Sequence, residues 1–160
     1  MRIQKTVLLF FFIILQRGQT FSQQAAAVDS IKANYAKATT PEEKVYWLDH
    51  LSRTLMNVDL PQAEEYGKQL ITVAEESRDR KLMVKAYMSN GIRCSYFGGQ
   101  KEYTTRSIGY FSKALDIARQ NKMEKEIGAA QLKLCAIHLA IPDKDKALIY
   151  QPGFFIDLNT

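Results

Sequence analysis

The chain has 160 residues, of which 46% are hydrophobic and 24% are charged, with 8 Gly, 4 Pro and 2 Cys. This length holds one domain with a sizeable core and is too short for two. The cysteine count excludes a disulfide-stapled miniprotein, and the low Gly and Pro content excludes a collagen-like or disordered chain. The formal net charge is +5, but Arg2, Lys5 and Arg17 in the leader supply much of it. We therefore expect no nucleic-acid partner.

The first 22 residues are organised like a secretory signal peptide. Arg2 and Lys5 make the start positive, residues 7–15 are an unbroken apolar run, and Thr20 and Ser22 are small residues suited to a cleavage site. The apolar run is less than half of the ~20 residues that span a bilayer, which favours cleavage after Ser22 over a retained anchor. The sequence predicts a periplasmic or secreted protein without a lipoprotein cysteine, associated with a membrane only if the leader is uncleaved.

The rest of the chain is predicted to be helical, because its apolar residues recur at helical rather than strand spacing. Thr40 and Glu43 form a capping box with Pro41 at the first helical position. Asp59 caps the next helix. Further helices are predicted over 80–97, from Thr104 or Thr105 to Gln120, over 123–140 and, after a turn at Pro142-Asp143, up to Tyr150, with a leading helix over 28–37.

Two turns between these helices have recognisable residues. Gly98-Gly99 ends the third helix of the body, and Asn121 is expected to adopt the left-handed conformation that ends the fourth. The four glutamates of the second helix, Glu64-Glu65 and Glu75-Glu76, fall on its outer face, where paired carboxylates are expected to be solvated surface.

Self-similarity distinguishes a repeat array from a helix bundle. Alignment of the helix pairs places Leu51, Gly91 and Cys135 at one first-helix position, and it places Ala63, Ser107 and Ala147 at one second-helix position. Small residues there let the two helices of a hairpin approach closely. The predicted fold is all-α, an α-solenoid of about three antiparallel hairpins. Its parts are a leader segment over 23–39, repeats over 40–79, 80–121 and an incomplete 122–151, and an apolar tail over 152–160.

This pattern resembles the tetratricopeptide repeat (TPR) family, with its W-x2-L-G-x2-Y, A-x3-F and closing P signature. The residues that carry the resemblance are Trp47 and Ala63 in the first unit, Tyr87, Gly91, Ser107, Phe111 and Ala114 in the second, and His138 and Ala147 in the third. Leu51 and Cys135 depart from the family's glycine, and no proline closes a unit. The length of about 40 residues keeps HEAT-type repeats as a lesser alternative.

The resemblance implies a right-handed superhelix whose first helices line a concave groove for a peptide or protein partner. The implied groove residues are Leu48, Ser52, Lys85, Met88, Ser95 and Tyr96, with Leu132 and Ala136 from the third unit. Lys85 and Tyr96 are expected to be the main polar contacts. The leading hypothesis is a non-catalytic protein-interaction module outside the cytoplasm.

A second hypothesis comes from the opening of the body. Residues 28–32, 38–45 and 145–148 also resemble the extracytoplasmic TPR sensor regions of bacterial histidine kinases, whose chains continue into a membrane helix and a kinase. The apolar Phe154 and Phe155 are unsuited to the polar cap that ends a repeat array. On this hypothesis the chain is a truncated sensor fragment, and its third unit is the least stable.

An enzyme with an unrecognised site is the third and weakest hypothesis. His50 and His138 lack partners at metal-ligand spacing, and His138 is expected in the core. Cys94 and Cys135 fall on inward faces; free buried thiols are favoured, with a disulfide left open. We therefore predict no catalytic site, no metal and no cofactor.

Overall fold

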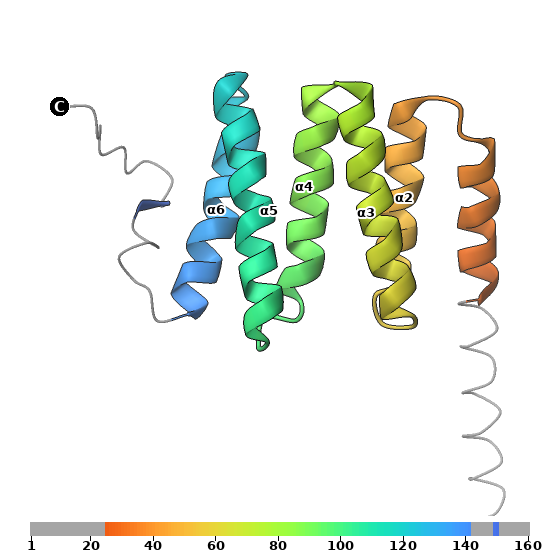
Figure 1. Cartoon of the computed structure of the whole chain (residues 1–160), viewed down its shortest axis with the longest axis horizontal. Helices are drawn as coiled ribbons and strands as arrows, with labels where there is room; N and C mark the ends of the chain where they lie inside the picture. Colours follow the sequence, from red (N-terminus) through yellow and green to blue (C-terminus); the bar gives the residue numbers. More distant parts are fainter. Residues whose placement is uncertain (1–24, 142–148, 151–160) are drawn as a thin grey trace, which may run out of the picture.

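The described part of the chain in the computed structural model, residues 25–141 and 149–150, contains helices and turns but no strand. The predicted all-α class is thus confirmed. A leading helix over 25–37 precedes five labelled helices (Figure 1): α2 (Pro41–Leu55), α3 (Leu60–Ser77), α4 (Arg80–Ser95), α5 (Lys101–Gln120) and α6 (Glu124–Ala140). The predicted signal peptide over 1–22, most of the helix predicted after Pro142-Asp143, with Ala147, and the apolar tail over 152–160 fall outside the described residues.

The helices form two consecutive hairpins, α2–α3 and α4–α5, followed by α6. Each helix packs on the next along the chain, and α2 also contacts α4, as α4 contacts α6. The α3 and α5 backbones make no such contact within the described helices. An inner layer of α2, α4 and α6 is therefore covered by α3 and α5, as expected of a repeat-like fold (Figure 1).

The helix starts follow the sequence signals. The Thr40 side chain accepts a hydrogen bond from the Glu43 amide, and the Glu43 carboxylate accepts from the Thr40 amide, which completes the predicted capping box. Asp59 Oδ1 accepts from the Gln62 amide at 3.0 Å and caps α3. Asp79 caps α4 in the same way. Three of the five labelled helices thus begin at a side-chain cap.

Helix α5 ends at Gln120 as predicted, but its predicted start and its predicted left-handed residue were wrong. Helix α5 begins at Lys101, about one turn before Thr104, and has no side-chain cap that could have marked it in the sequence. At its other end Lys122 has the positive φ of 54°, whereas Asn121 has a φ of −108°. The left-handed residue is therefore the one after the predicted Asn121.

Both hairpins cross closely at small residues. Ser107 Oγ donates a hydrogen bond to the Gly91 carbonyl at 2.7 Å, and the Phe111 ring lies directly over Gly91. In the first hairpin Ser52 Oγ donates to the Ala63 carbonyl at 3.0 Å. A serine hydroxyl therefore joins the two helices of each hairpin, although the serine stands on the second helix in one and on the first in the other.

The core runs through the array as three adjoining clusters of buried residues. The first unites the leading helix with α2 and α3, the second unites α2, α3 and α4, and the third unites α4, α5 and α6. Fully buried members include Val45, Leu48, Leu51, Leu70, Phe111 and Leu134. Each hairpin thus buries the apolar side of its neighbour, which is how repeat arrays gain stability.

The crossing at Gly91 generates a stability prediction. A Cβ at this position would lie 2.5 Å from a Phe111 ring carbon, so Gly91→Ala is expected to destabilise the fold by about 1–3 kcal/mol. Gly109→Ala in α5 is the matched control, because a Cβ there meets nothing within 4 Å. The control should stabilise by about 0.5–1 kcal/mol. Urea unfolding checks both, and a stabilising Gly91→Ala would contradict the close crossing.

The capping box generates a pH prediction. The Thr39 and Thr40 amides donate to the Glu43 carboxylate and hold its pKa below the ordinary value. The ionised side chain therefore stabilises the fold above the pKa of the unfolded chain, and this stability is lost as the pH falls through the lowered folded pKa. We expect Glu43→Gln to lower the melting temperature at neutral pH, with a difference that disappears in acid. Glu42→Gln in the same turn is the control, and an equal pH dependence for both would contradict the prediction.

Candidate functional site

The inner face of α4 carries four of the predicted groove residues. Lys85, Ser95 and Tyr96 are exposed, and Met88 is half-buried. Tyr96 is the most open of the large side chains here, at 70% exposed. Lys85 Nζ lies 5.7 Å from the ring centroid of Tyr46 on α2, a cation–π contact between neighbouring inner helices. These side chains are accessible to a partner.

Two predicted groove residues on α2 are misplaced. Leu48 is completely buried in the core between α2, α3 and α4. Ser52 is 2% exposed, and its hydroxyl donates a hydrogen bond to the Ala63 carbonyl. The groove prediction was wrong for both, because the α2 face that carries them turns toward α3. The exposed α2 side chains beside α4 instead include Tyr46, His50 and Arg53.

The third-unit residues lie on an open surface of α6. Leu132 is 57% exposed, and Ala136 is exposed as well. Leu139, about two helical turns further along the same helix, is also exposed. Helix α6 thus presents apolar side chains that no described residue covers.

The repeat-signature residues occupy the interior to different degrees. Leu51, Ala63, Gly91, Ser107, Ala114 and His138 are buried, whereas Trp47 and Cys135 are half-buried. The His138 ring stacks on Tyr150 with centroids 5.6 Å apart. Ala147 belongs to the part of the chain that is not described.

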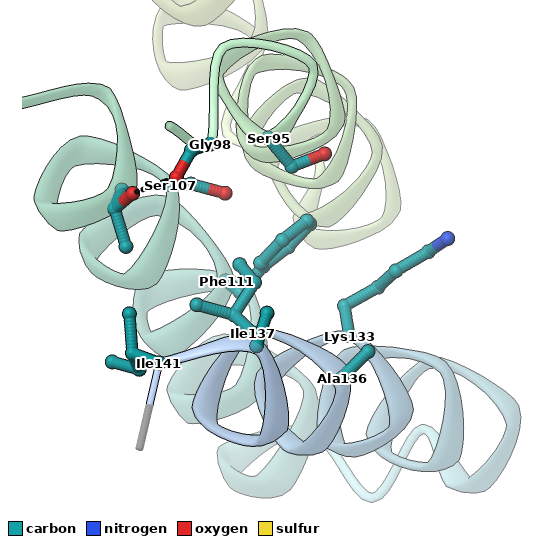
Figure 2. Close-up of a pocket in the computed structure, with 10 residues that line it drawn as sticks. Ser95, Gly98, Ser107, Phe111, Lys133, Ala136, Ile137 and Ile141 are labelled. Carbon is teal, nitrogen blue, oxygen red and sulfur yellow. Dashed lines mark hydrogen bonds between the residues drawn. The ribbon is translucent and has the colours of Figure 1, made fainter. Parts of the chain in front are cut away.

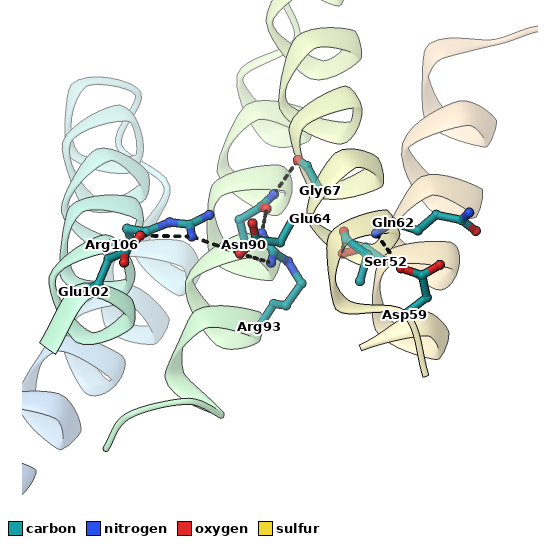
Figure 3. Close-up of polar contacts among 10 residues, drawn as sticks. Ser52, Asp59, Gln62, Glu64, Gly67, Asn90, Arg93, Glu102 and Arg106 are labelled. Carbon is teal, nitrogen blue, oxygen red and sulfur yellow. Dashed lines mark hydrogen bonds and ion pairs between the residues drawn. The ribbon is translucent and has the colours of Figure 1, made fainter. Parts of the chain in front are cut away.

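A polar network between α3, α4 and α5 was missed by the sequence reasoning (Figure 3). Buried Arg93 donates to Asn90 Oδ1 at 2.8 Å and lies 3.7 Å from Glu64. Arg106 of α5 donates to the same Glu64 carboxylate at 2.9 Å. Asn90 in turn donates to the Gly67 carbonyl at 2.9 Å. Glu64, expected on the solvated face, therefore links three helices.

The carboxylate at the other end of α3 is also engaged. Glu75 accepts a hydrogen bond from the buried Tyr87 of α4. Burial, together with this carboxylate, raises the pKa of Tyr87 to about 12. The expectation of solvated surface carboxylates was thus wrong for the half-buried Glu64, whereas Glu75 is exposed as expected and also accepts a hydrogen bond.

Two pockets open beside the inner helices. The first, which we call the basic pocket, has a volume of about 380 Å³ and lies between α2 and α4. Its described lining includes His50, Arg53, Thr54, Ile92, Arg93 and Tyr96. The second, the apolar pocket, has a volume of about 250 Å³ and lies between α4, α5 and α6 (Figure 2). Its described lining includes Ser95, Phe111, Ala136, Ile137, Ala140 and Ile141.

Within the described residues, neither a metal-ligand cluster nor a membrane-spanning helix is present. These residues contain no group of three or more His, Cys, Asp or Glu side chains that could hold a metal ion. Over the same residues, no helix combines the length and the apolar character needed to cross a bilayer. The absence of an enzyme activity stays a prediction.

Both cysteines are free thiols. Cys94 is buried, and burial raises the pKa of its thiol despite the nearby Arg93 and Arg106, which lower it. Cys135 is half-buried on α6. Cys94 and Cys135 are therefore not joined in this structure, and free thiols stay a prediction.

Comparison with known proteins adds no relative. No family model matches the chain, and no curated protein or solved structure matches it. The function must therefore be argued from the chain's own geometry and charge.

The cysteines generate a chemical prediction. Because only the thiolate reacts, the raised pKa and burial of Cys94 should make it alkylate more slowly than Cys135. Mass spectrometry of peptides after timed iodoacetamide treatment of the folded chain at pH 8 checks this order. In denaturant the two rates should converge. Faster reaction of Cys94 in the folded chain would contradict its position in the core.

Proposed function

We propose that this protein is a non-catalytic interaction module of the TPR type that binds a peptide or protein segment along its inner face. One observation carries the proposal: Lys85 and Ser95 of α4, and Tyr96 directly after its last residue, are exposed, and Tyr96 and Ser95 each line one of the two pockets. Exposed tyrosines are enriched among the residues that dominate binding energy. Half-buried Met88 adds a flexible apolar contact.

The TPR assignment is supported by the hairpin crossings. Gly91 beneath Phe111, and the hydroxyl link from Ser107, occur where the family's pattern has its small first-helix and second-helix residues. Leu51 and Ala63 share one core cluster in the first hairpin, at the equivalent positions. The concave surface of such arrays lies along the first helices of the hairpins, here α2, α4 and α6.

We place the protein outside the cytoplasm on the strength of the signal-peptide pattern of residues 1–22. As a second candidate we retain the sensor fragment of a histidine-kinase-like receptor. The exposed Leu132 and Leu139 of α6 favour it, because a following repeat in a longer chain would cover such a face. The downstream reading frame tests that candidate: repeats, a membrane helix and a kinase there would support it.

Peptides selected from a display library for binding to the full chain test the groove. Because Tyr96 and Lys85 are exposed and outside the core, Tyr96→Ala and Lys85→Glu should preserve the fold and each weaken a selected peptide by about tenfold or more. Fluorescence anisotropy measures the affinity, and circular dichroism checks the fold.

Lys68→Glu is the matched control, because Lys68 is an exposed lysine of the outer helix α3. It makes the same charge change and should leave peptide affinity unaltered. If the original chain, Lys85→Glu and Tyr96→Ala bind the selected peptide with equal affinity, the groove proposal is contradicted.

A further inference from the structure

We infer that the inner face recognises an extended peptide through two neighbouring pockets: the basic pocket takes a carboxylate side chain, and the apolar pocket takes a bulky apolar side chain about three residues away. The inference rests on the proposed function of this face and assigns it a class of ligand. It follows from the repeat register, from unused guanidinium donors and from hydroxyl groups that are already satisfied.

One wall of the two pockets is equivalent in the repeat register. The register that pairs Gly91 of α4 with Cys135 of α6 also pairs Ile92, Arg93 and Tyr96 with Ala136, Ile137 and Ala140. The first three residues line the basic pocket, and the second three line the apolar pocket. The array thus repeats one pocket wall with changed side chains.

A buried cation lies behind the basic pocket. Arg93 is 2% exposed, and its guanidinium lies beside Gly67 and 3.7 Å from Glu64, both of α3. Glu64 receives its hydrogen bond from Arg106, so two guanidinium groups share one carboxylate. Arg93 therefore adds positive charge behind the wall of the pocket, and the donors open to a ligand are those of Arg53.

Arg53 provides a second cation at the mouth of the same pocket. Its side chain is 70% exposed and reaches Asp49 only at 3.9 Å, a type of surface ion pair that contributes little. None of the described lining residues is an Asp or Glu. A guanidinium with free donors binds a carboxylate in two parallel hydrogen bonds, so a Glu or Asp side chain is the complementary ligand.

The apolar pocket lacks such donors. The hydroxyls of its Ser95, Thr104 and Ser107 already donate to backbone carbonyls of Ile92, Gly98 and Gly91. Lys133 extends away from the apolar side chains in Figure 2. The rest of the pocket lining is aromatic and aliphatic carbon. The pocket has a volume of about 250 Å³, which suits one large apolar side chain.

Helix spacing sets the distance between the two ligand side chains. The pockets lie on either side of α4, so their separation is close to one interhelix distance, about 10 Å. An extended peptide advances about 3.3 Å per residue. The acidic and apolar residues of the ligand should therefore be about three positions apart.

Labelled octapeptides test this motif on the full chain. The probes carry Glu and Leu three positions apart, in both orders. Each probe has two control peptides, its twins, one with Gln in place of Glu and one with Ser in place of Leu. We expect one order to bind, and we expect either twin of that peptide to bind at least tenfold more weakly by fluorescence anisotropy.

Matched variants assign each ligand residue to its pocket. Arg53→Glu should remove the preference for Glu over Gln. Arg119→Glu is the matched control, because both arginines stand in the last turn of a helix and compensate its dipole equally. This control should keep the preference. Ala140→Phe should fill the apolar pocket and remove the preference for Leu. Ala129→Phe, at an exposed position of the same helix, should keep it.

The outcomes separate this inference from the proposed function. Display-selected peptides that need Lys85 and Tyr96 but bind Arg53→Glu and Ala140→Phe unchanged would overturn the two-pocket motif and leave the groove intact. Probes that depend on Arg53 but not on Lys85 or Tyr96 would support the basic pocket and overturn the wider groove. Inorganic phosphate binding at Arg53 without any preference for Glu over Gln would also overturn the motif.

Discussion

The crossing of α4 over α5 at Gly91 is the contact on which the rest of the structure depends. The Phe111 ring occupies the space that a side chain at this position would need, and Ser107 ties the two backbones together. A hairpin whose two helices pack this closely still exposes one apolar face, which it must bury against the next hairpin. The apolar pocket, which Phe111 and Ser107 line, lies beside this crossing.

Sequence alone was sufficient for the parts of the fold that local chemistry specifies. Thr40, Asp59 and the apolar spacing marked helix starts because a cap and an amphipathic face are encoded within a few neighbouring residues. The start of α5 escaped prediction because Gln100 supplies no side-chain cap. Leu48 and Ser52 were misassigned because they were placed by the register of the repeat resemblance, whereas both belong to the buried face of α2 that Val45, Leu51 and Leu55 mark by their apolar spacing.

The network around Arg93 could not have been read from spacing. Arg93 stands in a helix with a weak amphipathic pattern, because α4 is covered on several sides, and its partners come from different helices. One local signal did exist. Gly67 leaves room for the network, since a Cβ there would lie 2.5 Å from Asn90 Oδ1. A glycine inside a helix, with Asn and Arg spaced to share a face of the next helix, is typical of polar packing between them.

On the two-pocket proposal, equivalent positions of the array differ in lining while the arrangement of the helices stays the same. Arg93 and Ile137 occupy equivalent positions, yet the arginine introduces a buried charge while the isoleucine contributes to an apolar wall. The arginine is tolerated because Glu64 and Asn90 partly satisfy it from α3 and α4. The charge that the packing of α3, α4 and α5 holds behind one pocket, and that the other pocket lacks, is therefore the difference on which the proposed preference for an acidic side chain depends.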